Sequence, residues 1–295
     1  MIHKPVLKKE VLQYLDPKPN ENFIDATVGE GGHALEILKK TAPWGKLLGI
    51  DLEKKQIYNS RFNLADVKER VILKNDSYSN IKNIVLENRF GPVDGVLLDL
   101  GFSSWHLEES GKGFSFNKDE PLDMRYSDKN GLTAEKIINE YPEHKVEKIL
   151  REFGEEKFSK QIARKIAAHR KTKKIKNTLG LVNIIRETLP GKFHHGKIHL
   201  ATRSFQALRI AVNEELDKLK EFLPQAIEIL SVNGRIVIIS FHSLEDRIVK
   251  NFFKGKEKLN QVKILNKKPI LASNEELLEN PRARSAKLRA ITKIK

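Results

Sequence analysis

The chain has 295 residues, which is enough for one large domain or two ordinary domains with an ample core. It contains no cysteine, which excludes disulfides, thiolate catalysis and cysteine-ligated zinc and fits the reducing cytoplasm, where we expect the protein. Its net charge of +15 suggests a polyanionic partner, and the absence of a long apolar run or an apolar leader argues against a membrane partner.

The first hundred residues alternate short apolar runs with helical patterns. The runs at 23–26, 47–50, 71–73 and 93–98 have the length and composition of buried strands. Helical patterns separate them, as at 34–40 and 54–64. This alternation predicts an α/β fold with a doubly wound parallel sheet.

The turn after the first predicted strand carries the clearest ligand signal. Gly29, Gly31 and Gly32 allow a ligand to approach the backbone, and Asp51 ends the next strand. An acid about 20 residues beyond such a turn can accept hydrogen bonds from both ribose hydroxyls. The turn lacks the strict dinucleotide spacing, and Glu30 would repel a pyrophosphate, so S-adenosylmethionine fits better. A plain tight turn, with Asp51 capping the next helix, stays open as the alternative.

The strand rhythm stops after Asp99 and resumes at 235–240, with final strands expected at 262–265 and 288–294. The intervening segment predicts helices, which we expect at 133–139, 144–153, 156–169 and 179–189. A long amphipathic stretch at 203–230, broken near Asn213, then returns to the sheet. We therefore predict a sheet domain of residues 1–105 and 209–295 and an inserted helical substrate-recognition domain of residues 106–208.

The excess positive charge is concentrated in this insertion. Between Lys145 and Arg209 there are 17 Lys or Arg and five Glu, a surplus of 12. Because the bias persists across several predicted elements, it favours contact with phosphates over a merely solvated helix face.

Asp99 is the candidate chemical residue, since it ends the fourth strand beside the glycine turn if the strand order has the usual switch point. A carboxylate there can accept hydrogen bonds from a substrate amine and aim its lone pair at a methyl group. A turn, a cap or cofactor contact are the alternatives for Asp99. Phe102 either stacks on a base or packs in the core.

Phe241 and His242 follow the fifth predicted strand and should face the segment after Asp99. His242 either bonds a base edge or supports its neighbours, and Ser243 with Asp246 should form the capping box of the next helix. His195 and His199 are spaced i, i+4, but no carboxylate or cysteine completes a ligand set, so we expect no metal.

Seven blocks in order along the chain resemble the bacterial ribosomal RNA small subunit methyltransferase H family. They are DATVGEGGH (25–33), DLGFSS (99–104), GFSF (113–116), PLDMR (121–125), ATRSFQALR (201–209), ISFHSLEDR (239–247) and NPRARSAKLR (280–289). Together they are far more specific than the glycine turn alone.

The resemblance implies a class I S-adenosylmethionine-dependent methyltransferase, a Rossmann-like sheet with an inserted helical domain. It implies N4-methylation of a cytosine in the decoding region (P site) of 16S rRNA, with small-subunit rRNA or a 30S particle as partner. The family's cofactor contacts fall on Gly31, Gly32, His33, Asp51, Tyr78, Asp99 and His106. Tyr78 replaces the usual Phe, and Trp105-His106 replaces the usual Pro-Gln.

Candidate contacts to the substrate RNA are Arg125, Arg203, Arg209, Asn213 and Arg247. Each arginine can equally be a structural ion-pair partner. Three other functions stay open: an amino-methyltransferase acting on DNA or protein, a non-catalytic RNA-binding factor and, disfavoured by the turn, a nicotinamide dehydrogenase.

Overall fold

The computed structural model describes residues 4–101, 104–128, 130–193 and 198–295. The chain forms two compact units, here called the sheet unit (Met1–Gly101 with Leu216–Lys295) and the helical unit (Phe102–Glu215). The division lies at residues 101 and 215, whereas we predicted 105 and 208. The second boundary differs because Phe205, Leu208 and Val212 of helix α10 (Thr202–Asn213) are buried in the core of the helical unit.

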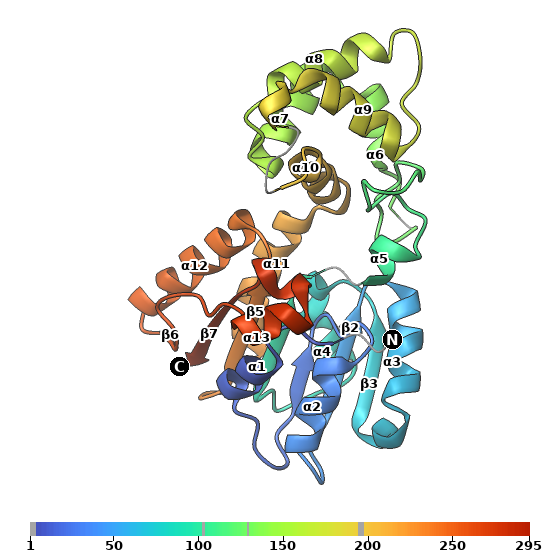
Figure 1. The fold of residues 1–295 in the computed structure, drawn as a ribbon. Coiled ribbons are helices and arrows are strands. Elements are labelled where there is room, and N and C mark those ends of the chain that lie inside the picture. Colours follow the sequence, from blue (N-terminus) through green and yellow to red (C-terminus); the bar gives the residue numbers. More distant parts are fainter. Residues whose placement is uncertain (1–3, 102–103, 129, 194–197) are drawn as a thin grey trace. The chain divides into compact units, whose positions relative to one another are not determined.

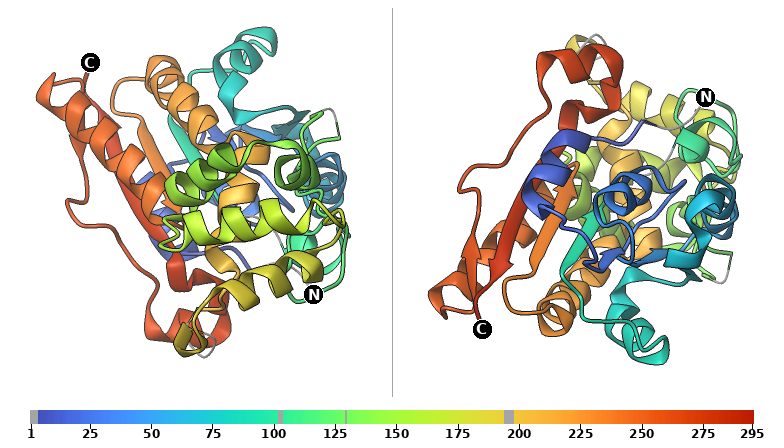
Figure 2. Two further views of the ribbon diagram at one scale, coloured as in Figure 1. Left: turned by 90° about the horizontal axis from the view of Figure 1, so that it is seen from above. Right: turned by 90° about the horizontal axis from the view of Figure 1, so that it is seen from below.

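The sheet unit is built on seven strands in the order β3-β2-β1-β4-β5-β7-β6 (Figure 1). The five parallel strands are β1 (Phe23–Asp25), β2 (Leu47–Asp51), β3 (Val71–Asn75), β4 (Gly95–Asp99) and β5 (Arg235–Ser240). β7 (Lys287–Lys293) runs antiparallel between β5 and β6 (Val262–Ile264), and Figure 2 shows it beside β5. All seven predicted strands are confirmed, with ends that differ by at most two residues.

Helices cover both faces of this sheet, which explains why its strands are apolar throughout. Ile24, Leu48 and Val96 point into one core, whereas their neighbours Phe23 and Leu47 point into the other. The first core is closed by α4 (Ile81–Glu87), α11 (Glu215–Ile229) and α12 (Ser243–Lys258), and the second by α1 (Lys8–Leu15), α2 (Gly32–Lys40) and α3 (Lys54–Asn63). The remaining elements are η1 (Ala65–Arg70), η2 (Tyr78–Asn80), α13 (Asn274–Glu279) and η4 (Pro281–Ser285).

The helical unit has a hydrophobic core of its own. Besides α10, its elements are α5 (Ser104–Glu108), α6 (Ala134–Glu140), α7 (Glu143–Gly154), α8 (Ser159–His169), α9 (Thr178–Thr188) and η3 (Gly191–Phe193). α7 and α10 approach closely, since a Cβ on Gly154 would lie 2.5 Å from the carbonyl oxygen of Arg203. The predicted break near Asn213 is confirmed, because Glu214 ends α10 with a left-handed φ of 54°.

None of the helices in the described part of the chain has both the length and the apolarity needed to cross a membrane.

Candidate active site

The strand order reverses between β1 and β4, and this switch point positions the candidate site of the sheet unit. β1 pairs with β2 on one side and with β4 on the other, which is the usual switch point, and β4 pairs with β5, as we expected. In open α/β sheets, ligands bind beyond the carboxyl ends of the strands at such a point. Asp25, Asp51 and Asp99 are the last residues of β1, β2 and β4, and Phe241 follows β5.

The glycine turn is held open by Asp51. Gly29 and Gly31 have φ values of 52° and 88°, a conformation that side chains rarely adopt, and α2 begins at Gly32. The Asp51 carboxylate accepts hydrogen bonds from the N–H of Gly29 at 2.9 Å and from the N–H of Glu53 at 2.8 Å. The predicted alternative, Asp51 as helix cap, is wrong, because the residue at the N-cap of α3 is Glu53. Each carboxylate oxygen has a second lone pair with which it can accept a ligand hydroxyl.

A buried acidic cluster lies beside the turn. His33 Nε2 is buried, makes no hydrogen bond and lies 3.7 Å from Asp99 Oδ2. Asp25 is 1% exposed, and this burial raises the pKa of its carboxyl group to about 7. The His33 charge lowers that pKa, whereas the charges of Asp99 and Asp51 raise it further. Three carboxyl groups close enough for Asp51 and Asp99 to act on the pKa of Asp25 suit a cationic ligand better than an anionic one.

Asp25 was not among the residues that we predicted for the site. The available signal was an acid at the end of an otherwise apolar strand, immediately before the glycine turn. Such a position is buried only because α2 and the neighbouring strands cover it, so the sequence alone did not indicate its environment.

The backbone around Asp99 is fixed by neighbouring strands. The N–H of Asp99 donates to Thr27 Oγ1 at 2.7 Å, and the N–H of Gly101 donates to Asp99 Oδ1 at 2.9 Å. A Cβ on Gly101 would lie 2.9 Å from the Phe241 ring and 3.0 Å from Asp99 Oδ1. Phe241 therefore lies against the segment that follows Asp99, as the strand order led us to expect. Phe102 lies outside the described residues.

His242 is a helix cap. Its Nδ1 accepts the N–H of Glu245 at 3.4 Å, and Glu245 Oε2 accepts the N–H groups of Phe241 and His242 at 2.8 and 3.2 Å. The predicted capping box at Ser243 and Asp246 is wrong by one residue, because Asp246 instead pairs with Arg289 at 2.6 Å. His242 is thus committed to its own helix end, which favours the support role over contact with a base edge.

Two predicted cofactor residues pack through their rings. Tyr78 begins η2 just beyond β3, and its ring meets Phe222 edge-on at 5.6 Å. His106 belongs to the helical unit, where it is 5% exposed and its ring lies 5.0 Å from both Phe114 and Tyr126. Contact of either residue with a cofactor stays a prediction.

Two of the candidate arginines form bidentate ion pairs within the helical unit. Arg125 donates to both carboxylate oxygens of Asp123 at 2.7 Å, and Arg209 donates to Glu215 at 2.9 and 3.0 Å. Burial works to raise the pKa of Asp123, but hydrogen bonds from Arg125 outweigh it and lower that pKa. These placements favour the structural alternative for both arginines.

Asn213 also has an internal role. Its side chain accepts the N–H of Tyr126 at 2.9 Å and donates to the carbonyls of Met124 and Arg209 at 2.7 and 3.0 Å. The residue is 3% exposed, so the predicted RNA contact is replaced by a clamp between α10 and residues 124–126.

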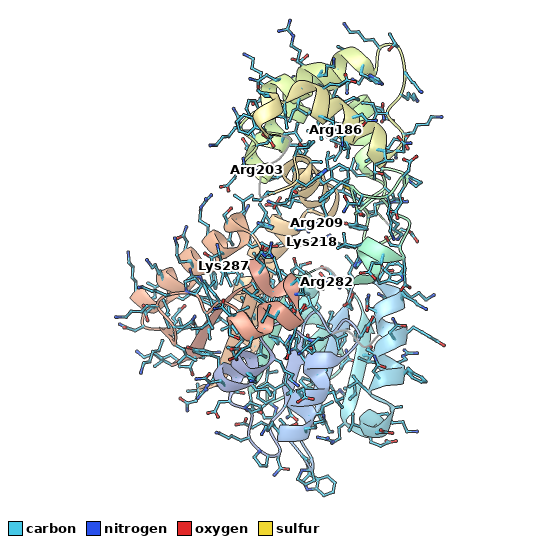
Figure 3. All side chains as sticks on the ribbon, viewed as in Figure 1. Arg186, Arg203, Arg209, Lys218, Arg282 and Lys287 are labelled. Carbon is cyan, nitrogen blue, oxygen red and sulfur yellow. The ribbon has the colours of Figure 1, made fainter. Side chains whose placement is uncertain are left out.

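The other predicted RNA contacts are on the surface. Arg203 (labelled in Figure 3) is exposed on α10, and Arg247 is exposed on α12. His199 stacks on Phe116 at 4.3 Å, and its Nδ1 accepts the N–H of Ala201 at 3.3 Å. His194 and His195 lie outside the described residues.

Comparison with known proteins gives the family. A model described as the MraW methylase family matches residues 1–294. Ribosomal RNA small subunit methyltransferase H of Dictyoglomus thermophilum is 47% identical over 289 residues, which cover 98% of this chain and 95% of that protein. The protein of the same name from Thermotoga neapolitana is 46% identical over 291 residues, with the same coverage.

Among solved structures, a putative rRNA methylase from Clostridium thermocellum matches with a TM-score of 0.49 at 15% identity and covers both chains fully, a likeness too remote to bear on function. The seven-stranded sheet with its antiparallel β7 is that of a class I methyltransferase. Since the family match runs almost from end to end at high identity, the chain belongs to the MraW methylase family.

Proposed function

We propose that this protein methylates small-subunit ribosomal RNA with S-adenosylmethionine, and that the methyl group goes to the exocyclic N4 of a cytosine in the decoding region of 16S rRNA. Family membership and near-full-length relatives named ribosomal RNA small subunit methyltransferase H support the rRNA substrate. The choice of an exocyclic amine rests on one observation, the placement of Asp99 at the switch point opposite His33.

The residues of the sheet unit fit the cofactor. The left-handed turn at Gly29 and Gly31 opens the backbone, and Asp51 at the end of β2 is the proposed acceptor for the ribose hydroxyls. The buried carboxyl of Asp25 and the half-buried carboxyl of Asp99 favour a sulfonium and ammonium cation and disfavour a pyrophosphate. When bound, S-adenosylmethionine supplies an electrophilic methyl group.

The chain's own contribution to the reaction is orientation. The Asp99 carboxylate is an acceptor for an amine hydrogen, and this contact aims the nitrogen lone pair while leaving the amine electron-rich. Its backbone is held by Thr27 and its Oδ1 by Gly101, so little freedom has to be lost when the substrate binds. Phe241 closes one side of this segment, and Glu245 holds the Phe241 backbone in place.

The target cytosine has to leave its stack before its amine can reach the methyl group. Binding of structured RNA also requires positive charge on the protein surface. The helical unit supplies it on its surface, in the run from Lys171 to Lys174, which is exposed throughout, and in Arg203. These side chains are the proposed phosphate contacts of that unit.

The decisive experiment is transfer of labelled methyl from S-adenosylmethionine to small subunits that lack the modification, followed by nucleoside analysis. Naked 16S RNA, DNA and bulk protein are assayed in parallel. The expected product is N4-methylcytidine from the subunits or their RNA. Label in a different nucleoside would overturn the N4 assignment, and label in DNA or protein alone would overturn the rRNA assignment. Cofactor binding without transfer to any substrate would identify a non-catalytic factor.

A further inference from the structure

The sheet unit has a hollow whose lining residues all lie outside the candidate active site. It has a volume of about 290 Å³ and lies between α12 and the β6–β7 edge of the sheet, which Figure 1 shows side by side. Three lysines line it, Lys250 and Lys254 from α12 and Lys267 from the segment after β6. Its only acidic lining residue is Glu257.

The polar groups on the floor of this pocket are paired with one another by hydrogen bonds and an ion pair. Arg289, which is 7% exposed, is paired with Asp246 through two hydrogen bonds of 2.6 and 3.2 Å. The Asn266 amide donates to the carbonyls of Leu288 and Lys268 and accepts the N–H of Ala290. Even Glu257 is partly engaged, because it accepts the N–H of Ile264 at 2.9 Å. The floor therefore has few groups left for a ligand.

The three lysines that line the pocket lack the pairing found on its floor. In the part of the chain that the structure describes, Lys250, Lys254 and Lys267 form no ion pair or side-chain hydrogen bond. Lys250 and Lys254 are spaced i, i+4, so their side chains share one face of α12. Three ammonium groups around a saturated floor form a site for an anion, and the volume is at the lower end of the range for small ligands, which suits the phosphate and sugar of one nucleotide.

The segment that surrounds the pocket also carries a net positive charge. From residue 243 to residue 268 there are eight Lys or Arg and three acids, a surplus of five. Two of those acids are turned inward, since Glu245 is 2% exposed and Asp246 is paired with Arg289. The outer face of α12 is thus almost purely cationic, which favours a polyanion over a single small anion.

Helix α12 also extends from the candidate active site to this pocket. It begins directly after Phe241 and His242, and Arg247, Lys250 and Lys254 follow at intervals of three and four residues. From Ser243 to Lys254 a helix rises about 17 Å. An RNA strand whose target base lies near Asp99 can reach the pocket within a few nucleotides.

We propose that this pocket binds a backbone phosphate of the rRNA substrate near the target base, so that the sheet unit itself holds RNA. The proposal rests on the function proposed above. The test variant is Lys250→Gln/Lys254→Gln/Lys267→Gln. The matched control is Lys40→Gln/Lys46→Gln/Lys68→Gln, which removes three exposed lysines that precede β2 and β3, at the other edge of the same sheet.

Binding of unmodified small-subunit RNA is measured against salt for the wild type and both variants. The pocket variant should bind about tenfold more weakly at about 100 mM salt, with a salt slope shallower by about 0.7, because one phosphate contact on a single strand is lost. Its KM for RNA should rise while kcat and S-adenosylmethionine affinity stay the same. The control should resemble the wild type.

If the wild type is active and the pocket variant has the same RNA affinity and salt slope as the control variant, the pocket does not bind RNA. That result would leave the proposed function intact. A wild type that neither binds nor methylates rRNA would overturn the proposed function and this inference with it. A final arm titrates a nucleoside monophosphate and inorganic phosphate. Saturable binding that only the pocket variant loses, with RNA binding unchanged, would identify a free nucleotide site and exclude the RNA role.

Discussion

The Asp51 carboxylate accepts the backbone N–H of Gly29 at 2.9 Å, so the acid that ends β2 also holds the turn that follows β1. This one contact couples the two halves of the proposed cofactor site. Loss of the carboxylate should therefore loosen the turn and remove the ribose acceptor together.

Asp51→Ala should weaken S-adenosylmethionine binding by about 10- to 100-fold, because hydrogen bonds to a charged group contribute about 1.5–3 kcal/mol each. Isothermal titration calorimetry measures the change. Asp66→Asn, on the exposed η1 segment, is the control for loss of one acid. Wild-type affinity in Asp51→Ala would remove this residue from the cofactor site.

Asp99→Asn should lower kcat by at least about 100-fold, because an amide in place of the carboxylate weakens the acceptor that orients the amine. Single-turnover methyl transfer gives the rate, and cofactor affinity is measured in the same variant because Asp99 also lies near His33. A variant that binds cofactor normally and turns over at the wild-type rate would refute the orienting role.

Asp25 should make stability depend on pH in the cofactor-free protein. Its pKa is raised from 3.8 to about 7, so between about pH 4 and pH 7 the folded state keeps a proton that the unfolded chain has lost. The free energy of unfolding should therefore fall as pH rises through this window and level off above it, by about 4 kcal/mol at most.

Asp25→Asn removes this titration while it keeps the shape of the side chain. Urea unfolding of both proteins from pH 5 to pH 8 is the measurement, and the difference between them isolates Asp25 from other titrating groups. The variant should gain stability relative to the wild type as pH rises. A difference that does not change with pH would show that Asp25 is ionised throughout.

Arg209 and Arg203, both on α10, should respond differently to removal. Arg209→Met removes the bidentate ion pair with Glu215, in which the side chains are 12% and 11% exposed, and should destabilise the protein by about 2–4 kcal/mol. Arg203→Met should change stability by less than about 0.5 kcal/mol and instead weaken RNA binding. Denaturant unfolding measures the change in stability, and RNA titration measures the change in affinity. A stability loss only in Arg203→Met and an affinity loss only in Arg209→Met would contradict the assigned roles.

Gly101→Ala should impair catalysis without unfolding the protein, because the new methyl group would lie 2.9 Å from the Phe241 ring. We expect kcat to fall, with a circular dichroism spectrum like that of the wild type. Phe241→Leu in the same chain removes the ring and should restore part of the rate if the clash is the cause. No loss of rate in Gly101→Ala would show that the loop has room to move.

The sequence by itself determined the strands, the principal helices and the order of the site motifs. These features are local: a buried strand needs a run of apolar residues, and a left-handed turn needs glycines such as Gly29 and Gly31. The acid at Asp51 and the strand end at Asp99 were predictable for the same reason, because each follows directly on its own apolar run.

Only the tertiary structure decided what the polar side chains do, because their partners are distant in sequence or their burial depends on other elements. Asp246 pairs with Arg289, 43 residues away, so it does not cap α12, and His242 takes that place. Arg209 meets Glu215 only because the chain turns at Glu214. The raised pKa of Asp25 comes from burial by α2 and the neighbouring strands, and no local pattern of residues encodes that desolvation.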